Sequence, residues 1–342
     1  MKVIHRGAVA LLTTLVLILA AGCAGNSASA DTVRVGLSSK SPTMLALFAA
    51  LKNGYFAEEG LHVPEPTILP SGARLAAAVV GGSIDVGIGV TPDVFNLHQS
   101  GEPVKIIGAV YNSYYVDVVA GNGITAANSA DLSTKIRSLI GKKIGITGPG
   151  SGTEALVTYL FRTVGADAKT DAELVSLGSD PSAAINALRS GQVDAVSHIL
   201  SIGQQAELDG VGRIFISPGR GDIPALQGVV HGVAFALQPT IDGHRGELVK
   251  FLRGLHRGME YIHADPADAR QVLADLLTGM SPAVIDALMP PITAHAATSL
   301  NVDPRGYQAE SDMLTKTGLA PGGAPRRSDI VSADLIAAAG GT

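Results

Sequence analysis

The sequence has no tryptophan, a single cysteine and few aromatic residues, which make up 4% of its 342 residues. One cysteine can form neither an internal disulfide nor a cysteine zinc site. Charged residues are also scarce, at 16%, whereas hydrophobic residues make up 46%, and this balance is typical of a folded protein. The formal net charge is -5, with 25 Lys and Arg against 30 Asp and Glu, which argues against nucleic acid as a partner.

Motifs for cofactors and metals are missing as well. The glycine-rich stretch 148–153 lacks the lysine of a Walker A motif and the spacing of a dinucleotide fingerprint. It also lacks the G-x-S-x-G spacing of a hydrolase nucleophile. No H-x-E or H-E-x-x-H sequence occurs anywhere in the chain. We therefore expect neither a cofactor nor a metal site.

The first 22 residues have the layout of a secretion signal. A positively charged start precedes an apolar run over 8–21, which is short for a membrane span. The sequence LAAGC ending at Cys23 resembles a bacterial lipobox, in which the cysteine thiol carries diacylglycerol. An ordinary signal peptide cut near 28–30 is the alternative. We expect a signal peptide over 1–22, a tether over 23–31, and lipid anchoring at the extracytoplasmic face of the cell membrane.

Beyond the tether, short apolar segments alternate with amphipathic ones, which predicts a mostly parallel α/β sheet. Two passages repeat the same features in the same order: Gly36 and Asp85 recur as Gly145 and Asp194, each 109 positions later. This spacing favours two lobes built on one plan. We interpret the two aspartates as hydrogen-bonding residues at strand starts, and not as a catalytic acid and base.

Past Gly228 the pattern changes to one strand followed by helices. Asp265-Pro266 and Ser281-Pro282 are predicted helix starts, because proline favours the first helical position. We interpret these helices as a return to the first lobe, packed on its outside. The expected organisation is a first lobe over 32–118, a second lobe over 119–229, and the return with the C-terminal helices over 230–342.

Polar loops follow the predicted strands where helices begin. Unpaired N–H groups and the helix dipole attract anions or polar acceptors there, and matching loops in two lobes favour a shared cleft. For any single loop, plain capping with bound water is the alternative. Lys40 could add a positive charge, and His231 has the same strand-end position as His198. The candidate ligand-binding residues are Ser39, Ser41, Thr91, Tyr111, Ser151, Gly152, Thr153 and His198.

Four segments together resemble the SsuA/THI5-like (NMT1-like) periplasmic solute-binding proteins. They are NGYFAEEGL at 53–61, the helix and GSIDVG at 73–87, KKIGI and GSGT within 142–153, and ALRSGQVDA at 187–195. The resemblance covers 32–290. It implies a type II periplasmic-binding-protein fold, in which two α/β lobes joined by two crossover strands close around one ligand. The expected crossovers are 116–120 and 229–235.

The resemblance also implies a partner, the permease of an ABC importer, and a small solute such as nitrate, an alkanesulfonate, taurine or a thiamine-precursor pyrimidine. Carried over residue by residue, the site comprises Ser39, Ser41, Thr91 and 151–153, with Tyr111 and His198 as additions. The lack of tryptophan weakens the pyrimidine interpretation. Because the matched loops contain no arginine, an anionic solute would depend on backbone N–H groups, on hydroxyls and on Lys40. We expect a monomeric lipoprotein, not an enzyme, that binds a small polar or anionic organic solute.

Three alternatives stay open. The first is a protein that binds a thiamine-precursor pyrimidine, and the second is a ligand sensor that works without a transporter. The third is an enzyme, since a fungal protein of this family makes a thiamine pyrimidine precursor. That activity uses a cysteine-rich motif, which Cys23 alone cannot supply.

Overall fold

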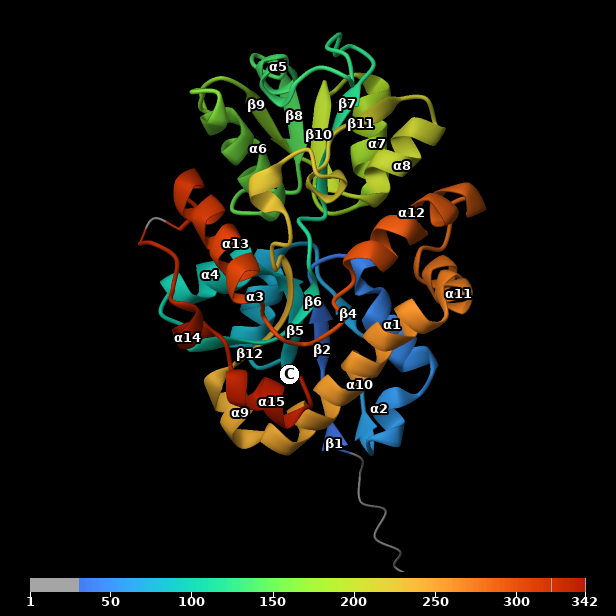
Figure 1. Cartoon of the computed structure of the whole chain (residues 1–342), viewed down its shortest axis with the longest axis vertical. Coiled ribbons are helices and arrows are strands. Elements are labelled where there is room, and N and C mark those ends of the chain that lie inside the picture. Colours follow the sequence, from blue (N-terminus) through green and yellow to red (C-terminus); the bar gives the residue numbers. More distant parts are fainter. Residues whose placement is uncertain (1–30, 321, 342) are drawn as a thin grey trace, which may run out of the picture. The chain divides into compact units, whose positions relative to one another are not determined.

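Two five-stranded mixed sheets form the framework of the computed structural model, which describes residues 31–320 and 322–341 (Figure 1). The expected signal peptide and Cys23 lie outside the described residues. The first sheet, in spatial order, consists of β4 (Thr67–Ile68), β2 (Val35–Leu37), β5 (Val86–Val90), β12 (Gly232–Leu237) and β6 (Val104–Tyr111). The second consists of β9 (Glu173–Ser176), β8 (Lys143–Ile146), β10 (Ala195–Ile199), β7 (Val116–Gly121) and β11 (Gly212–Ile216).

The two sheets follow one plan. In each, the second strand pairs in parallel with its two neighbours, and the fourth pairs antiparallel with the third and fifth. Helix α3 (Gly72–Val80) and strand β5 begin 109 positions before helix α7 (Pro181–Ser190) and strand β10. The α/β fold class and the two lobes built on one plan are confirmed. The expectation of a mostly parallel sheet is wrong, because β7 and β12 run antiparallel to both of their neighbours and so make two of the four pairings in each sheet antiparallel.

The repeated glycines allow close packing against the strands. A Cβ atom on Gly36 would lie 2.8 Å from Leu75 Cδ1, and one on Gly145 would lie 2.4 Å from Leu177 Cδ1. Both distances are too short for a real contact. Glycine at this position in each lobe therefore lets a leucine cover the strand without having to shift.

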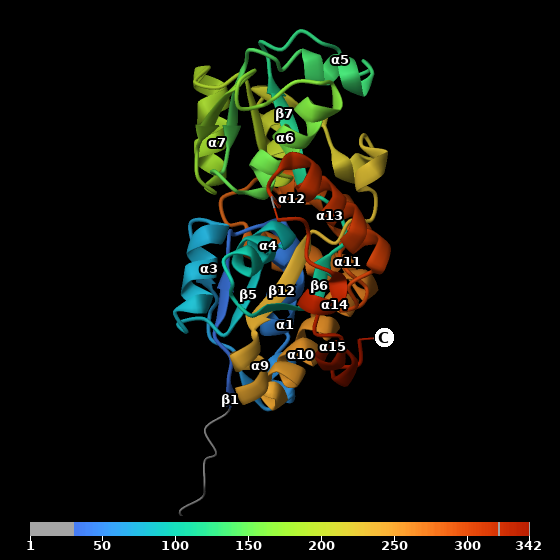
Figure 2. The same ribbon diagram turned by 90° about the vertical axis from the view of Figure 1, so that its left-hand side faces the viewer.

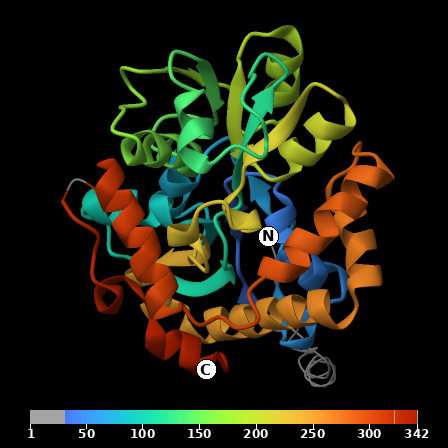
Figure 3. The same ribbon diagram turned by 45° about the horizontal axis from the view of Figure 1, so that its top comes forward.

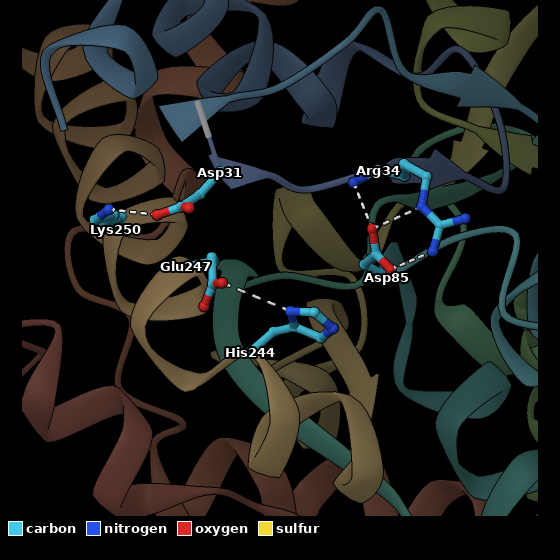
Figure 4. A network of polar contacts seen from close by, with 6 residues as sticks. All are labelled: Asp31, Arg34, Asp85, His244, Glu247 and Lys250. Atoms are coloured by element: carbon cyan, nitrogen blue, oxygen red, sulfur yellow. Dashed lines mark hydrogen bonds and ion pairs between the residues drawn. The ribbon is translucent and has the colours of Figure 1, made fainter. Parts of the chain in front are cut away.

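The repeated aspartates are hydrogen-bonding residues, as predicted. Asp85 Oδ2 accepts a bond of 2.8 Å from the Arg34 N–H, and Asp194 Oδ2 accepts one of 2.9 Å from the Lys143 N–H. Figure 4 shows the Arg34 guanidinium also facing Asp85, with bonds of 2.9 and 2.5 Å. Burial raises the pKa of Asp85, but the hydrogen bonds and charge of Arg34 outweigh it and lower the pKa below its usual value.

Helices cover both sheets, and the two predicted proline helix starts are confirmed: Asp265 and Ser281 cap α11 (Pro266–Leu276) and α12 (Pro282–His295) with their side chains. None of the helices in the described ranges has the length and hydrophobicity of a membrane-spanning segment. Up to α8, the remaining elements are β1 (Asp31–Thr32), η1 (Pro42–Met44), α1 (Leu45–Lys52), α2 (Tyr55–Glu58), β3 (Leu61–His62), α4 (Thr91–Gln99), α5 (Leu132–Arg137), α6 (Gly152–Thr163) and α8 (Ser201–Leu208). The later ones are η2 (Pro218–Arg220), η3 (Pro224–Leu226), α9 (Gln238–Gly243), α10 (Arg245–Ala264), α11 (Pro266–Leu276), α12 (Pro282–His295), α13 (Pro304–Thr317), α14 (Arg327–Ile330) and α15 (Ala333–Ala338).

The chain passes between the two sheets through 112–115 and again through 217–231. The expected crossovers at 116–120 and 229–235 are therefore misplaced by several residues. Residues 116–120 belong to β7, which pairs on both sides within the second sheet. Most of 229–235 belongs to β12, which pairs on both sides within the first sheet.

The C-terminal helices contact both lobes. Helix α10 packs along α1 (Figure 2) and α2 (Figure 1) of the first lobe, and its Lys250 Nζ lies 2.7 Å from Asp31 Oδ2 (Figure 4). Helix α12, however, contacts α8, and α13 contacts α6, both in the second lobe. Figure 3 shows orange α12 and red α13 on opposite sides of the view. The interpretation that these helices pack only outside the first lobe is therefore incomplete.

Candidate ligand-binding site

A cavity of about 60 Å³ lies between loops of the two lobes. Most of its residues follow a strand or begin a helix, which is where open α/β sheets bind ligands. The 60 Å³ is the space open to the centres of water-sized spheres, and one water needs roughly 10–15 Å³ of such space. The cavity therefore has room for about four to six waters or one small polyatomic group. The lining residues are Ser38, Ser39, Ser71, Gly72, Val90, Asp93, Tyr115, Val116, Thr147, Ser151, Gly152, Thr153, Ser179, His198, Ile199 and His231.

The start of α6 brings several hydroxyls together. Ser151 caps the helix by accepting a bond of 3.3 Å from the Glu154 N–H. Thr153 Oγ1 accepts one of 2.9 Å from the Thr147 N–H and lies 2.7 Å from Ser151 Oγ. Glu154 is drawn back from the cavity because its Oε2 accepts the Gly150 N–H at 2.6 Å. The start of α6 therefore presents N–H groups and hydroxyls, and no carboxylate, to a ligand.

Helix α3 begins at the same cavity from the first lobe. Ser71 caps it by accepting the Arg74 N–H at 3.3 Å. The first N–H groups of α3 and α6, at Gly72 and Gly152, have no acceptor within the part of the chain that the structure describes. Two helix starts from opposite lobes therefore present free donors to one small space.

The only carboxylate among the described residues lining this cavity belongs to Asp93. Its Oδ2 accepts the Val90 N–H at 3.1 Å at the start of α4. Its Oδ1 sits beside Gly72, where a Cβ atom would overlap it at 1.8 Å. Burial raises the pKa of Asp93 to about 6, although the Val90 hydrogen bond and nearby His231 oppose the shift.

Both ring nitrogens of His198 are committed to the protein backbone. Nδ1 accepts the Ile199 N–H at 3.0 Å, so the hydrogen of the neutral ring is on Nε2, which donates to the Gly178 oxygen at 3.3 Å. Burial lowers the pKa of His198 to about 4. His198 therefore lines the cavity as a neutral wall and has no spare donor for a ligand.

His231 has the opposite character. It is fully buried, and its Nδ1 lies 2.8 Å from Glu310 Oε1 on α13. Its Nε2 has no hydrogen-bond partner. The ring packs against Tyr114, with centroids 3.9 Å apart and the planes tilted by 31°, and the Tyr114 hydroxyl donates to the Gly152 oxygen at 2.5 Å. Burial raises the pKa of Tyr114 well above its usual value, so this hydroxyl stays protonated.

The structure brings five of the eight candidate residues to the cavity: Ser39, Ser151, Gly152, Thr153 and His198. Ser41 is fully buried and accepts the Thr43 N–H at the start of η1. Thr91 donates to the Val230 oxygen at 2.7 Å, and Tyr111 donates to the Pro291 oxygen at 2.9 Å. These three side chains serve the protein itself and do not line the cavity. Lys40 lines a separate surface cavity beside α7 and α11.

Sequence reasoning missed several lining residues. Ser71 has a usable signal, because it stands 109 positions before Asp180, the cap of the equivalent helix α7. Asp93 has a usable signal too, because it directly follows Thr91-Pro92, and proline favours the first turn of a helix. The sequence offers His231, like His198, as a strand-end histidine that could face the cleft, but nothing in the local pattern indicates its partner Glu310.

Two sheets of this strand order, with a cavity at the strand ends between them, define a type II periplasmic-binding-protein fold. Residues 41–269 match the NMT1/THI5-like family model. The chain therefore belongs to this family.

Solved structures of low sequence identity share the fold. A Bordetella bronchiseptica protein is 22% identical, with a TM-score of 0.76 over 90% of this chain and 96% of that one. The alkanesulfonate-binding protein SsuA from Xanthomonas axonopodis, bound to MOPS, is 19% identical, with a TM-score of 0.69 over 89% and 97%. The nitrate-binding protein NrtA from Synechocystis is 15% identical, with a TM-score of 0.67 over 91% and 88%. No curated protein matches the sequence.

Proposed function

We propose that the protein binds a small polar or anionic organic solute of the sulfonate, taurine or nitrate type and delivers it to an ABC permease. The observation that carries this proposal is the cavity between the lobes, where N–H groups at the starts of α3 and α6 face a ring of hydroxyls. Such donors suit the oxygens of a sulfonate or nitrate group. The fold relatives that bind an alkanesulfonate and nitrate support the same solute class.

The cavity size also bears on the solute. About 60 Å³, which is room for a few waters, suits the small head group of a solute. Tyr115 and His231 line the cavity, but their rings pack edge to face against each other, with centroids 5.0 Å apart, and leave no open slot between them. We therefore favour the anionic solute over the thiamine-precursor pyrimidine.

The proposed delivery follows from closure of the lobes. A solute held by both lobes stabilises the closed arrangement, which the permease would recognise. We further propose that a lipid on Cys23 holds the protein at the extracytoplasmic face of the membrane. A sensor would use the same cleft without a permease. The two roles are therefore separated by measuring solute uptake in cells with and without the permease: uptake that depends on both the protein and the permease indicates delivery.

A thermal-shift panel tests solute binding directly. The panel contains methanesulfonate, taurine, nitrate and a thiamine-type aminopyrimidine, added to the mature chain. A solute at about 100 times its dissociation constant adds roughly 2.7 kcal/mol of stability, which corresponds to a rise in Tm of about 4 °C for a chain of this size. No shift with any member of the panel would contradict the proposal.

Two neighbouring serines provide a matched comparison. Ser39 lines the cavity, whereas Ser41 is buried and caps η1. Ser39→Ala should weaken solute binding with little change in Tm of the free protein. Ser41→Ala should lower that Tm by the loss of a cap while the affinity stays the same. The reverse pattern would mean that the solute lies elsewhere.

A further inference from the structure

His231 and Glu310 form a buried pair at the wall of the cavity. The two side chains are fully buried, and Nδ1 of the ring lies 2.8 Å from Oε1 of the carboxyl group. The opposite ring nitrogen, Nε2, is buried without a partner, and so is the second carboxyl oxygen, Oε2. Among the described residues, no Lys or Arg forms an ion pair with Glu310. The pair must therefore balance its own charge.

Charge balance decides whether Nε2 carries hydrogen. A pair holding two protons is neutral overall, either as carboxylate with imidazolium or as carboxylic acid with neutral imidazole. In both arrangements the bond to Glu310 uses Nδ1, so Nε2 has a hydrogen and is a donor. With one proton fewer, the pair has a net charge of -1 and Nε2 presents a lone pair. A buried, uncompensated charge is costly, so burial favours the neutral pair with its free donor.

This donor lies beside the start of α6, a helix of 12 residues. A Cβ atom on Gly152 would be 3.1 Å from His231 Nε2, so the ring edge and the first N–H of the helix are neighbours. The Tyr114 and Tyr115 rings pack on the imidazole, and the Tyr114 hydroxyl is used by the Gly152 oxygen. Asp93 from α4 is the remaining titratable group near the ring, and its carboxylate would oppose an anion.

We propose that His231, held by Glu310, anchors the negatively charged end of the solute, and that the anion is bound together with one proton on this pair. The inference rests on the proposed function and specifies the charge of the solute that the site binds. An anion bound at Nε2 requires the hydrogen there, so the pair must hold both protons when the anion is bound. Wherever the free pair holds one proton fewer, binding takes that proton up. Affinity for an anion then falls as the pH rises, at most tenfold per pH unit for one coupled proton.

Calorimetry of the mature chain tests the proposal with methanesulfonate and nitrate. Both probes stay anionic between about pH 5 and pH 9, so any proton exchanged belongs to the protein. Titrations in two buffers of different ionisation enthalpy count the protons. We expect uptake that approaches one proton per anion at the alkaline end, together with weaker binding there.

Three variants assign the proton. Glu310→Gln keeps a partner for Nδ1 but cannot become a buried anion, and His231→Gln keeps an amide donor near the Nε2 position without titrating. Both should bind the two anions with no proton uptake above about pH 7. Asp93→Asn removes the other titratable group and should retain the uptake. A merely structural role for the pair would lower Tm without changing the proton count.

The outcomes separate the inference from the proposed function. Binding of either anion without proton uptake would overturn the inference, as would uptake that persists in both Gln variants. Failure of both anions, with binding of choline or a neutral aminopyrimidine, would also overturn it while solute binding stands. If no solute binds at any pH, the proposed function falls as well.

Discussion

Gly152→Ala tests the candidate site most directly, because this glycine begins α6 at the cavity wall. The new Cβ atom would lie 3.1 Å from Cε1 and Nε2 of His231 and 3.4 Å from the Tyr114 hydroxyl. The imidazole would have to move by a few tenths of an ångström. The methyl group would also occupy space that a solute oxygen needs between Nε2 and the helix start.

The size of the effect follows from the bonds at stake. A hydrogen bond to a charged group contributes about 1.5–3 kcal/mol, so we expect the dissociation constant for methanesulfonate to rise about 10- to 150-fold. Stability should change by about 1 kcal/mol or less, because alanine is the better helix former and partly offsets the crowding. Calorimetric titration measures the first quantity, and chemical denaturation measures the second.

Gly148→Ala is the matched control. Gly148 lies in the same loop, but no atom lies within 4 Å of the position its Cβ would take, and it does not line the cavity. Its affinity should equal that of the wild type. Unchanged binding by Gly152→Ala, or an equal loss in both variants, would show that the solute does not contact the start of α6.

Three further predictions concern charge and anchoring. Burial raises the pKa of Asp93 to about 6, above the value near 3.9 of an unfolded chain, so the folded state holds the extra proton and stability falls as the pH rises through this window. Asp93→Asn should therefore gain stability relative to the wild type between about pH 4 and pH 7 in denaturation curves. For Asp85 the sign is opposite, since its net pKa is lowered: its pairing with Arg34 stabilises the fold above about pH 4, and this contribution disappears as the pH falls through the lowered pKa. Asp85→Asn should lose up to about 1 kcal/mol at neutral pH and nothing in strong acid, with Asp194→Asn as a control that lacks the arginine. Cys23→Ser should move the protein from the membrane fraction to the soluble fraction, and an unchanged membrane fraction would contradict the lipid anchor.

The scaffold of the site could be predicted because it depends on local patterns. Short apolar runs, prolines at helix starts and glycines at fixed spacing indicated most strands and helices. The interval of 109 residues indicated two lobes, and the equivalent bonds of Asp85 and Asp194 show the physical basis of that interval. The hydroxyls around Ser151 were predictable for the same reason, because a serine that follows a glycine-rich loop and precedes a helical segment is typical of a helix start.

Side-chain direction could not be read in this way. Ser39 and Ser41 have the same residue type and belong to the same loop, yet only Ser39 lines the cavity. The proline at position 42 begins η1 immediately after Ser41, so that serine becomes a buried cap. Thr91 is also drawn inward, because the Val230 oxygen of the connecting segment needs a donor. In each case a backbone group elsewhere determines the outcome.

The group that we infer to recognise the solute belongs to neither copy of the repeated plan. His231 comes from the segment that leads back to the first lobe, and Glu310 comes from α13, 79 residues later. The repeated elements supply helix starts and hydroxyls from both sides, which suit many small polar solutes. A titratable pair added from outside the repeat, and attached to a helix that contacts α6 of the second lobe, can couple solute charge to lobe closure. General affinity for polar groups would then come from the repeat, and selectivity for charge from the C-terminal addition.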